Sequence, residues 1–169
     1  IGALGQAKTS SAATTLSQLN QDCKLELVNH RLDAGELSHQ VARADVVLDC
    51  SDNFATRFAV NRACVAHRTP LVSGAAIRWE GQVAVFKGQP CYHCLYGESG
   101  EPEDTCSTNG VLAPVVGIIG SIQAVEAIKV ITVAGTPLNG RLLLMDALSM
   151  EWRSLRLNPD PNCPVCAHG

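Results

Sequence analysis

Apolar residues recur along the chain with two spacings, one typical of helices and one typical of strands. Leu16 and Leu19, three positions apart, follow the helical spacing, and Pro114 suits the first turn of a long helix. The predicted helices cover residues 6–19, 35–44, 54–67 and 114–133. Short aliphatic runs predict strands. The predicted strands cover residues 25–28, 46–50, 71–77, 81–86, 141–148 and 152–157, the last two forming a hairpin.

Strands and helices alternate in this pattern, which is typical of an α/β fold. The run 46–50 (VVLDC) is apolar throughout, so we expect a largely parallel sheet with helices on both faces. A length of 169 residues fits a single domain over 1–169. The acidic, turn-rich stretch 97–110 breaks the alternation and predicts an exposed, mobile crossover loop.

The composition narrows the class of partner. A chain that is 46% hydrophobic and 17% charged can fill a core and is not expected to be disordered. Thirteen Lys and Arg against sixteen Asp and Glu give a net charge of −3 without a basic cluster, so we expect no nucleic acid. Residues 105–125 carry no charge over about the length of a membrane span, but the helix continues into Glu126 and Lys129. A buried helix, with no membrane span, is the favoured interpretation.

Eight cysteines are unusual in such a chain. A sizeable aliphatic core and the absence of a signal-like opening segment favour the cytoplasm, where metal binding or reactive thiols are more typical than disulfides. The strongest motif is a pair of C-x-x-C turns, Cys91 with Cys94 and Cys163 with Cys166. Four thiolates complete a closed tetrahedral zinc site, which stabilises and does not catalyse. Residues 95–162 separate the two turns, so zinc would clamp the C-terminal tail onto the domain.

Alternatives to this zinc site remain open. A redox C-x-x-C normally opens a helix after a strand, whereas these motifs are predicted in proline-containing loops. A pair of disulfides is a second alternative, and His93 or His168 could replace one thiol.

The other four cysteines are predicted to differ in role. Cys23, Cys50 and Cys64 fall in apolar elements and are expected in the core. Cys106, in the acidic loop, is either a candidate nucleophile or an inert loop thiol, and the carboxylates around it disfavour its thiolate.

Two polar positions could bind a nucleotide. Asp52 follows the strand 46–50, and in open α/β sheets ligands bind outside the carboxyl ends of strands, where a carboxylate can hold Mg²⁺. The alternative is that Ser51, Asp52 or Asn53 caps the next helix. Lys8 begins the first helix, where a bound phosphate would offset its unfavourable charge, and the alternative is a solvated lysine. Asp49, on the strand, is expected to face inward.

The motifs in their order along the chain resemble the MoeB/ThiF/HesA family, bacterial relatives of ubiquitin-activating enzymes. The matching segments are Lys8, VVLDCSDN (46–53), Arg57, LVSGAAIRWEGQ (71–82), CYHC (91–94), TCSTNGVLAPVVGIIGSIQAVEAIK (105–129) and CPVC (163–166). The resemblance implies a Rossmann-like sheet. It also implies ATP- and Mg²⁺-dependent adenylylation of the C-terminal glycine of a ubiquitin-like sulfur carrier, MoaD-like or ThiS-like, for molybdenum cofactor or thiamine biosynthesis.

The resemblance assigns roles to individual residues. Lys8 would hold ATP phosphates, Asp52 would coordinate Mg²⁺, and Ser51 and Asn53 would line the nucleotide site. Cys106 matches a cysteine that links to the carrier in the thiamine-pathway member. The helix after Pro114 matches the family's homodimer interface. Another function class, a zinc-stabilised module that binds a carrier without chemistry, stays open, as does a thiol redox protein.

One part of the family pattern is missing from these 169 residues. Its glycine-rich nucleotide loop, acidic ribose ligand and arginine finger would all precede Lys8, and the chain contains no G-x-G-x-x-G. We therefore expect an N-terminally truncated domain that cannot adenylate its carrier alone.

Overall fold

A computed structural model describes residues 4–97 and 110–167 of the chain. Its contacts divide the chain into two units, Ile1–Asp33 and Ala34–Gly169, and each is described here by itself. The assignment of one domain over 1–169 stays a prediction.

The first unit contains one helix, α1 (Lys8–Leu19), which confirms the helix predicted over 6–19. The hydroxyl of Thr9 at its start donates to Asn29 Oδ1 over 3.3 Å. The strand predicted over 25–28 is wrong, because this segment is extended but joins no ladder, and Leu27 is exposed. A strand needs the backbone hydrogen bonds of a neighbouring strand, and all the described strands belong to the second unit.

The second unit is built around a five-stranded sheet with the order β1-β2-β3-β4-β5. The strands are β1 (Val47–Asp49), β2 (Leu71–Ile77), β3 (Glu80–Phe86), β4 (Arg141–Asp146) and β5 (Glu151–Arg156). Their positions confirm the predicted strands after residue 45. The prediction of a largely parallel sheet is wrong for the described strands, because β1 and β2 are parallel and the other three neighbouring pairs are antiparallel. Short turns after β2 and β4 form hairpins, and a hairpin reverses the direction of the chain.

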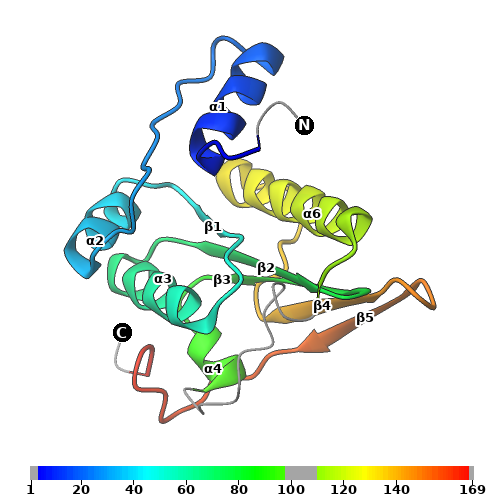
Figure 1. The fold of residues 1–169 in the computed structure, drawn as a ribbon. Helices are drawn as coiled ribbons and strands as arrows, with labels where there is room; N and C mark the ends of the chain where they lie inside the picture. The colour runs from blue at the N-terminus through cyan, green and yellow to red at the C-terminus, as the bar shows by residue number, and fades with distance from the viewer. Residues whose placement is uncertain (1–3, 98–109, 168–169) are drawn as a thin grey trace. The chain divides into compact units, whose positions relative to one another are not determined.

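Helices cover both faces of the sheet, as predicted (Figure 1). They are α2 (Ala34–Ala42), α3 (Phe54–His67), α4 (Tyr92–Tyr96) and α6 (Ala113–Thr132). Because successive strand residues point to opposite faces, Leu71 joins a core with Val60 of α3, while Val72 joins a second core with Ile119 of α6. Two apolar layers therefore hold the sheet between α3 and α6.

Helix α6 approaches the sheet closely over two glycines. A Cβ on Gly74 of β2 would lie 2.2 Å from the carboxamide of Gln123, and one on Gly81 of β3 would lie 2.5 Å from Ile119. The helix has one face on the sheet, while Val125, Ile128 and Ile131 on the rest of its surface are more than half exposed. The prediction of a buried helix is therefore right for one face only.

Among the described residues, α6 is the one helix whose length and composition would allow it to cross a membrane, and a third of its apolar window is buried. Two of its charged side chains, Glu126 and Lys129, make contacts within the domain. Glu126 accepts a hydrogen bond from the backbone N–H of Leu138 over 2.7 Å and pairs with Lys129 over 2.5 Å. These bonds fasten the helix to the chain that leads into β4.

Candidate functional site

The turn between β1 and α3 contains the polar residues predicted either to bind a nucleotide or to cap the next helix. Asn53 is the N-cap of α3, because its Oδ1 accepts from the backbone N–H of Thr56 over 2.8 Å. Ser51 bends back, and both its N–H and its hydroxyl donate to Asp49 Oδ1, over 2.9 and 2.7 Å. Asp52 is exposed, and its one hydrogen bond to a described residue is a 3.4 Å contact from Asn53 Nδ2. The cap is therefore Asn53, and the exposed Asp52 carboxylate has no capping role.

A buried pair of charged side chains, Asp49 and Arg57, lies next to this turn and bonds to its backbone. Asp49 and Arg57 are 4% and 6% exposed, and their charged groups lie 3.9 Å apart. The Arg57 guanidinium donates to the carbonyl oxygens of Ser51 and Gly74, so it binds the turn to β2. Asp49 Oδ2 has no hydrogen-bond partner among the described residues. The inward-facing Asp49 predicted from sequence is confirmed.

Gln123 of α6 reaches the same end of β1 from the other face of the sheet. Its Nε2 donates to the carbonyl oxygens of Asp49 and Val72, over 2.9 and 3.2 Å, and its Oε1 accepts from the thiol of Cys50. The protein atoms around its thiol partly desolvate Cys50, and this desolvation together with the nearby Asp49 raises the pKa of Cys50 although the residue is exposed. Sequence reasoning missed Gln123. A polar residue within an apolar helical face is the signal that could have found it.

Lys8 is exposed and begins α1, as predicted. The preceding Ala7 offers no side-chain cap, so the first N–H groups of the helix are left for another acceptor. Because Lys8 belongs to the first unit and Asp52 to the second, their meeting at one nucleotide stays a prediction.

The two C-x-x-C motifs come together in the structure. The Sγ atoms of Cys91, Cys94, Cys163 and Cys166 all lie within 4.8 Å of one another. Cys91 and Cys163 are 3.7 Å apart and Cys94 and Cys166 are 3.4 Å apart, well beyond a disulfide bond of about 2.05 Å. Four sulfurs at about 2.3 Å from one zinc ion would be about 3.8 Å from each other. This four-thiol cluster can hold zinc.

Other groups fix the orientation of the four thiols. Asn61 of α3, 1% exposed, donates to Cys91 Sγ over 3.6 Å and accepts from the N–H of Tyr92 over 2.9 Å. Burial raises the pKa of Cys91. Burial acts in the same direction on Cys163, but hydrogen bonds from the backbone of Cys166 and Val165 lower its pKa to about 7. Cys91 and Cys163 of the cluster therefore differ in the direction of their pKa shifts.

One argument against a redox role was wrong. Cys91 is the N-cap of the short helix α4, which begins soon after β3, so this motif does open a helix. What separates it from a redox motif is the second pair of thiols at the same place. His93 Nδ1 lies 3.7 Å from Cys163 Sγ, and the described set already has four sulfurs. His168 lies outside the described residues.

The remaining cysteines fit the predictions in part. Cys64 is buried, and burial with the nearby Asp49 raises its pKa to about 12. Cys23 and Cys50 are exposed, so their assignment to the core was wrong. Cys23 lies in the extended segment after α1, and Cys50 lies one residue beyond β1, where packing ends. Cys106 lies outside the described residues, and its role stays a prediction.

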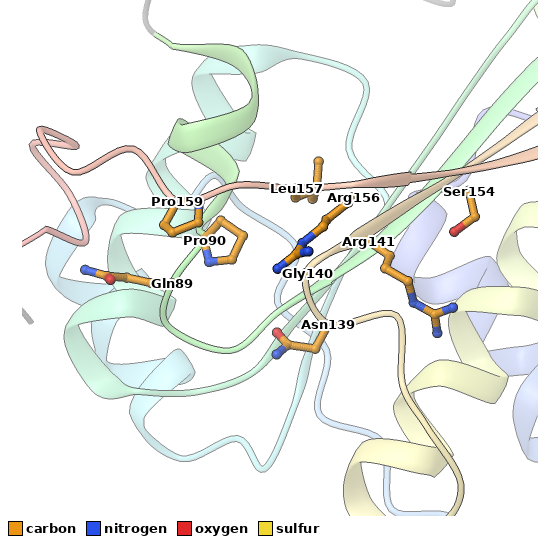
Figure 2. A pocket seen from close by; sticks show the side chains of 9 residues that line it. All are labelled: Gln89, Pro90, Asn139, Gly140, Arg141, Ser154, Arg156, Leu157 and Pro159. Carbon is orange, nitrogen blue, oxygen red and sulfur yellow. The ribbon is translucent and has the colours of Figure 1, made fainter.

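A hollow of about 530 Å³ lies at the other edge of the sheet (Figure 2). Gln89 follows β3, Arg141 begins β4 and Arg156 ends β5, so this hollow is at the edge opposite the carboxyl ends of β1 and β2. Ligands of open α/β sheets bind at the carboxyl ends of the parallel strands. We therefore place the candidate site at the turn with Asp52 and not in this hollow.

Fold and site together define an α/β protein with a carboxylate at the carboxyl edge of its sheet and a four-thiol cluster that joins its tail to the domain. The ThiF family model matches residues 2–165. The chain belongs to the ThiF family.

Relatives named for an activity are similar over almost the whole chain. The molybdopterin-synthase adenylyltransferase of Escherichia coli is 45% identical over 166 residues, which cover 96% of this chain and 67% of that protein. The sulfur carrier protein ThiS adenylyltransferase of Escherichia coli is 46% identical, over 96% of this chain and 66% of that protein. The chain thus spans about two thirds of the length of these relatives.

Solved structures show the same fold at lower identity. The structure of Escherichia coli MccB with ATP has a TM-score of 0.77 at 21% identity, and covers 95% of this chain and 51% of that one. The chain spans about half the length of that protein. The Rossmann-like α/β fold expected from the sequence is confirmed.

Proposed function

We propose that the protein containing this chain adenylates the C-terminal glycine of a ubiquitin-like sulfur carrier, with ATP and Mg²⁺. The observation that carries the proposal is Asp52. Its carboxylate is exposed at the carboxyl end of β1 and serves no capping role, while Asn53 and Ser51 do the structural work of the turn. The names of the similar adenylyltransferases support the reaction class.

The reaction joins two anions. The carrier's terminal carboxylate attacks the α-phosphorus of ATP, a P–O bond to that carboxylate forms, the α–β phosphate bond breaks, and pyrophosphate leaves. Mg²⁺ held at Asp52 would neutralise charge on the phosphates, and the Lys8 ammonium would bind them. No general base is required, since the attacking carboxylate is already ionised. Arg57 keeps Asp52 in place through the carbonyl oxygen of Ser51.

The four-thiol cluster has a separate role in this proposal. Zinc held by Cys91, Cys94, Cys163 and Cys166 would leave no open coordination position, so it would bind the tail to the domain and take no part in the reaction.

The exposed apolar face of α6 supports the predicted homodimer. Five apolar residues of the helix and its C-cap Val133 are more than one third exposed; the five are Val116, Ile118, Val125, Ile128 and Ile131. An Ile128→Asp variant places a charge in this face and is expected to yield monomers in sedimentation experiments. The matched variant Ala66→Asp, at an exposed position of α3 on the other side of the sheet, should keep the dimer.

ATP–pyrophosphate exchange with purified MoaD and ThiS tests the reaction. In the full-length protein Asp52→Asn should lower exchange at least about a hundredfold, because the charge on the phosphates is then left without its metal. Asp45→Asn is the matched control, since Asp45 is exposed at the opposite end of β1. Unchanged exchange in the Asp52→Asn variant would refute the proposal.

The same assay distinguishes the alternatives. The carrier that supports exchange assigns the pathway, molybdenum cofactor or thiamine. Carrier binding without exchange in the full-length protein would identify a non-catalytic binding module instead. For the 169 residues alone we expect no exchange, because the nucleotide loop of the family pattern is not among them. In the thiamine pathway, Cys106→Ser should leave exchange intact and abolish the covalent link to the carrier.

A further inference from the structure

The hollow of about 530 Å³ in Figure 2 has no part in the proposed function, because it lies at the edge of the sheet opposite Asp52. Its polar lining consists of two guanidinium groups, two carboxamides and one hydroxyl, from Arg141, Arg156, Gln89, Asn139 and Ser154. No Asp or Glu is among the described residues that line it. The hollow is therefore positively charged and rich in hydrogen-bond donors.

The two arginines of the hollow form a close pair at the end of the sheet. Arg141 begins β4, Arg156 ends β5, and the two are in register. The N–H of Leu157 donates to the carbonyl oxygen of Gly140 over 2.8 Å, so the neighbouring pair is hydrogen-bonded. Hydrogen-bonded and non-hydrogen-bonded pairs alternate along an antiparallel ladder, and in the second kind the Cα atoms are about 4.5 Å apart. The two arginines are such a pair, and their side chains leave the same face of the sheet.

This pairing of two positive charges is unfavourable by itself. Like charges directly opposite each other in a sheet are destabilising. Neither arginine forms an ion pair within the described part of the chain, and Arg141 has one weak hydrogen bond there, 3.4 Å from Nη2 to the carbonyl oxygen of Pro137. Figure 2 shows the two guanidinium groups directed away from each other. An anion bound by both arginines would replace this repulsion with attraction.

The hollow also has an apolar side, formed by Pro90, Leu157 and Pro159. Its volume of about 530 Å³ falls within the range of roughly 300–1,000 Å³ that is typical of small-molecule sites. The planar guanidinium group binds phosphate oxygens in pairs, and a phosphate ester carries nearly two negative charges at pH 7, which match two arginines. A molecule with a phosphate group and an apolar organic part fits both sides of the hollow.

We propose that this hollow binds a phosphorylated organic molecule, with its phosphate between Arg141 and Arg156 and its organic part against the two prolines. Ser154 is two residues from Arg156 on β5, so it points to the same face and can donate a further hydrogen bond to the phosphate. The site is separate from the Asp52 turn. The proposal therefore does not depend on the adenylylation proposed above.

A ligand in this hollow would contact the neighbours of both C-x-x-C motifs. Pro90 directly precedes Cys91, and Gln89 Nε2 donates to the carbonyl oxygen of Cys166. The ligand would thus hold together the same two segments as the four-thiol cluster. Since a ligand that binds only the folded protein stabilises it, binding here should raise Tm.

Calorimetric titration of the full-length protein with phenyl phosphate, without added Mg²⁺, tests the site. Phenyl phosphate should bind at least about tenfold more tightly than inorganic phosphate, which has no apolar part, or benzoate, which has a single charge. The Arg141→Gln/Arg156→Gln variant should bind phenyl phosphate at least about tenfold more weakly. At about a hundred times Kd, phenyl phosphate should raise the Tm of the wild-type protein by about 5 °C or more, and that of the variant by about half as much or less.

Arg153→Gln is the matched control. Arg153 is exposed on β5, three positions from Arg156, so it points to the other face of the sheet. Its variant should bind phenyl phosphate as the wild-type protein does, and so should Asp52→Asn, which alters the candidate nucleotide site. Without ligand, the double arginine variant should unfold at the wild-type temperature or above it, because it lacks the repulsion of two like charges. Weak binding by this variant then has no origin in unfolding.

Three results would overturn the proposal. The first is a wild-type protein that does not bind phenyl phosphate at millimolar concentrations. The second is an affinity for inorganic phosphate or benzoate equal to that for phenyl phosphate. The third is binding that Asp52→Asn abolishes and the double arginine variant retains, which would assign the bound phosphate to the candidate nucleotide site.

Discussion

The four-thiol cluster and the Asp52 turn are both built from residues that the sequence singled out, yet they differ in every physical respect. Three of its four cysteines are buried, its four sulfurs lie close together, and its two pairs come from the middle and from the C-terminal end of the second unit. Asp52 is exposed, its neighbours Ser51 and Asn53 are neutral, and the positively charged Arg57 binds the carbonyl oxygen of Ser51. A closed set of ligands holds a structure together, whereas an exposed carboxylate above a rigid base is available to a substrate.

Removal of metal should have the largest effect. Zinc binding to four thiols contributes folding free energy directly, so chelation or Cys91→Ser should lower the free energy of unfolding by more than about 3 kcal/mol. For a chain of this size that corresponds to a fall in Tm of about 10 °C. Thermal unfolding with metal analysis measures it, with the exposed Cys23→Ser as the control. Purified protein without bound zinc, or a Tm that chelation does not change, would contradict a structural role of zinc at the four-thiol cluster.

Asp49 and Asp52 lie three residues apart, and we expect the buried Asp49 to stabilise the fold while the exposed Asp52 does not. Asp49→Ala leaves the buried Arg57 guanidinium without its counter-charge and should cost about 3 kcal/mol or more. Asp52→Ala removes an exposed group and should change stability by less than about 0.5 kcal/mol. Urea unfolding of both variants provides the measurement. Equal losses would mean that Asp52 has a structural role after all.

The close contact between α6 and the sheet predicts a smaller effect. Gly74→Ala puts a methyl group 2.2 Å from the Gln123 carboxamide, so we expect a loss of about 1–3 kcal/mol. In the Gly74→Ala/Gln123→Ala double variant that clash is relieved, and the two losses should fall short of additivity by at least about 0.5 kcal/mol. Denaturation of the four proteins in the cycle tests this. Simple additivity would show that the helix moves away without cost.

Acidification should produce the smallest effect, at the turn between β4 and β5. Hydrogen bonds from the backbone N–H of Leu148 and from Ser149 lower the pKa of Asp146. A lowered pKa in the folded state means that the carboxylate stabilises the turn above its ordinary pKa and loses this effect as the pH falls through the folded value. Tryptophan fluorescence should therefore change below about pH 4. The Asp146→Asn variant, which keeps the acceptor oxygen without the charge, should lack that change.

Local pattern predicted the elements where it agreed with their final surroundings. The helix from Phe54 to His67 and the strand from Leu71 to Ile77 have the predicted bounds, because cap, stop and apolar spacing all lie within the segment. The segment 25–28 has the same strand character but no partner strand. The pattern of one segment carries no information about its neighbour, and a strand depends on both.

The site residues divide in the same way. The sequence identified the four thiols and Asp52, because their chemistry and spacing are visible in the chain itself. It missed the supports Asn61 and Gln123, since a lone amide within a helix shows its purpose only when the groups it bonds are brought beside it. Both amide side chains are buried in the folded protein, where they meet the groups that they bond. That burial depends on contacts between residues far apart in sequence.

The sequence by itself determined the kind of protein, a ThiF family α/β chain with two C-x-x-C motifs and a carboxylate after its first core strand. Only the tertiary structure decided that Asn53 caps α3, that the strands pair antiparallel beyond β2, and that Gln123 of α6 reaches the carboxyl end of β1. The physical reason is range: residue chemistry and periodicity act within a segment, whereas burial, register and charge pairing arise between segments.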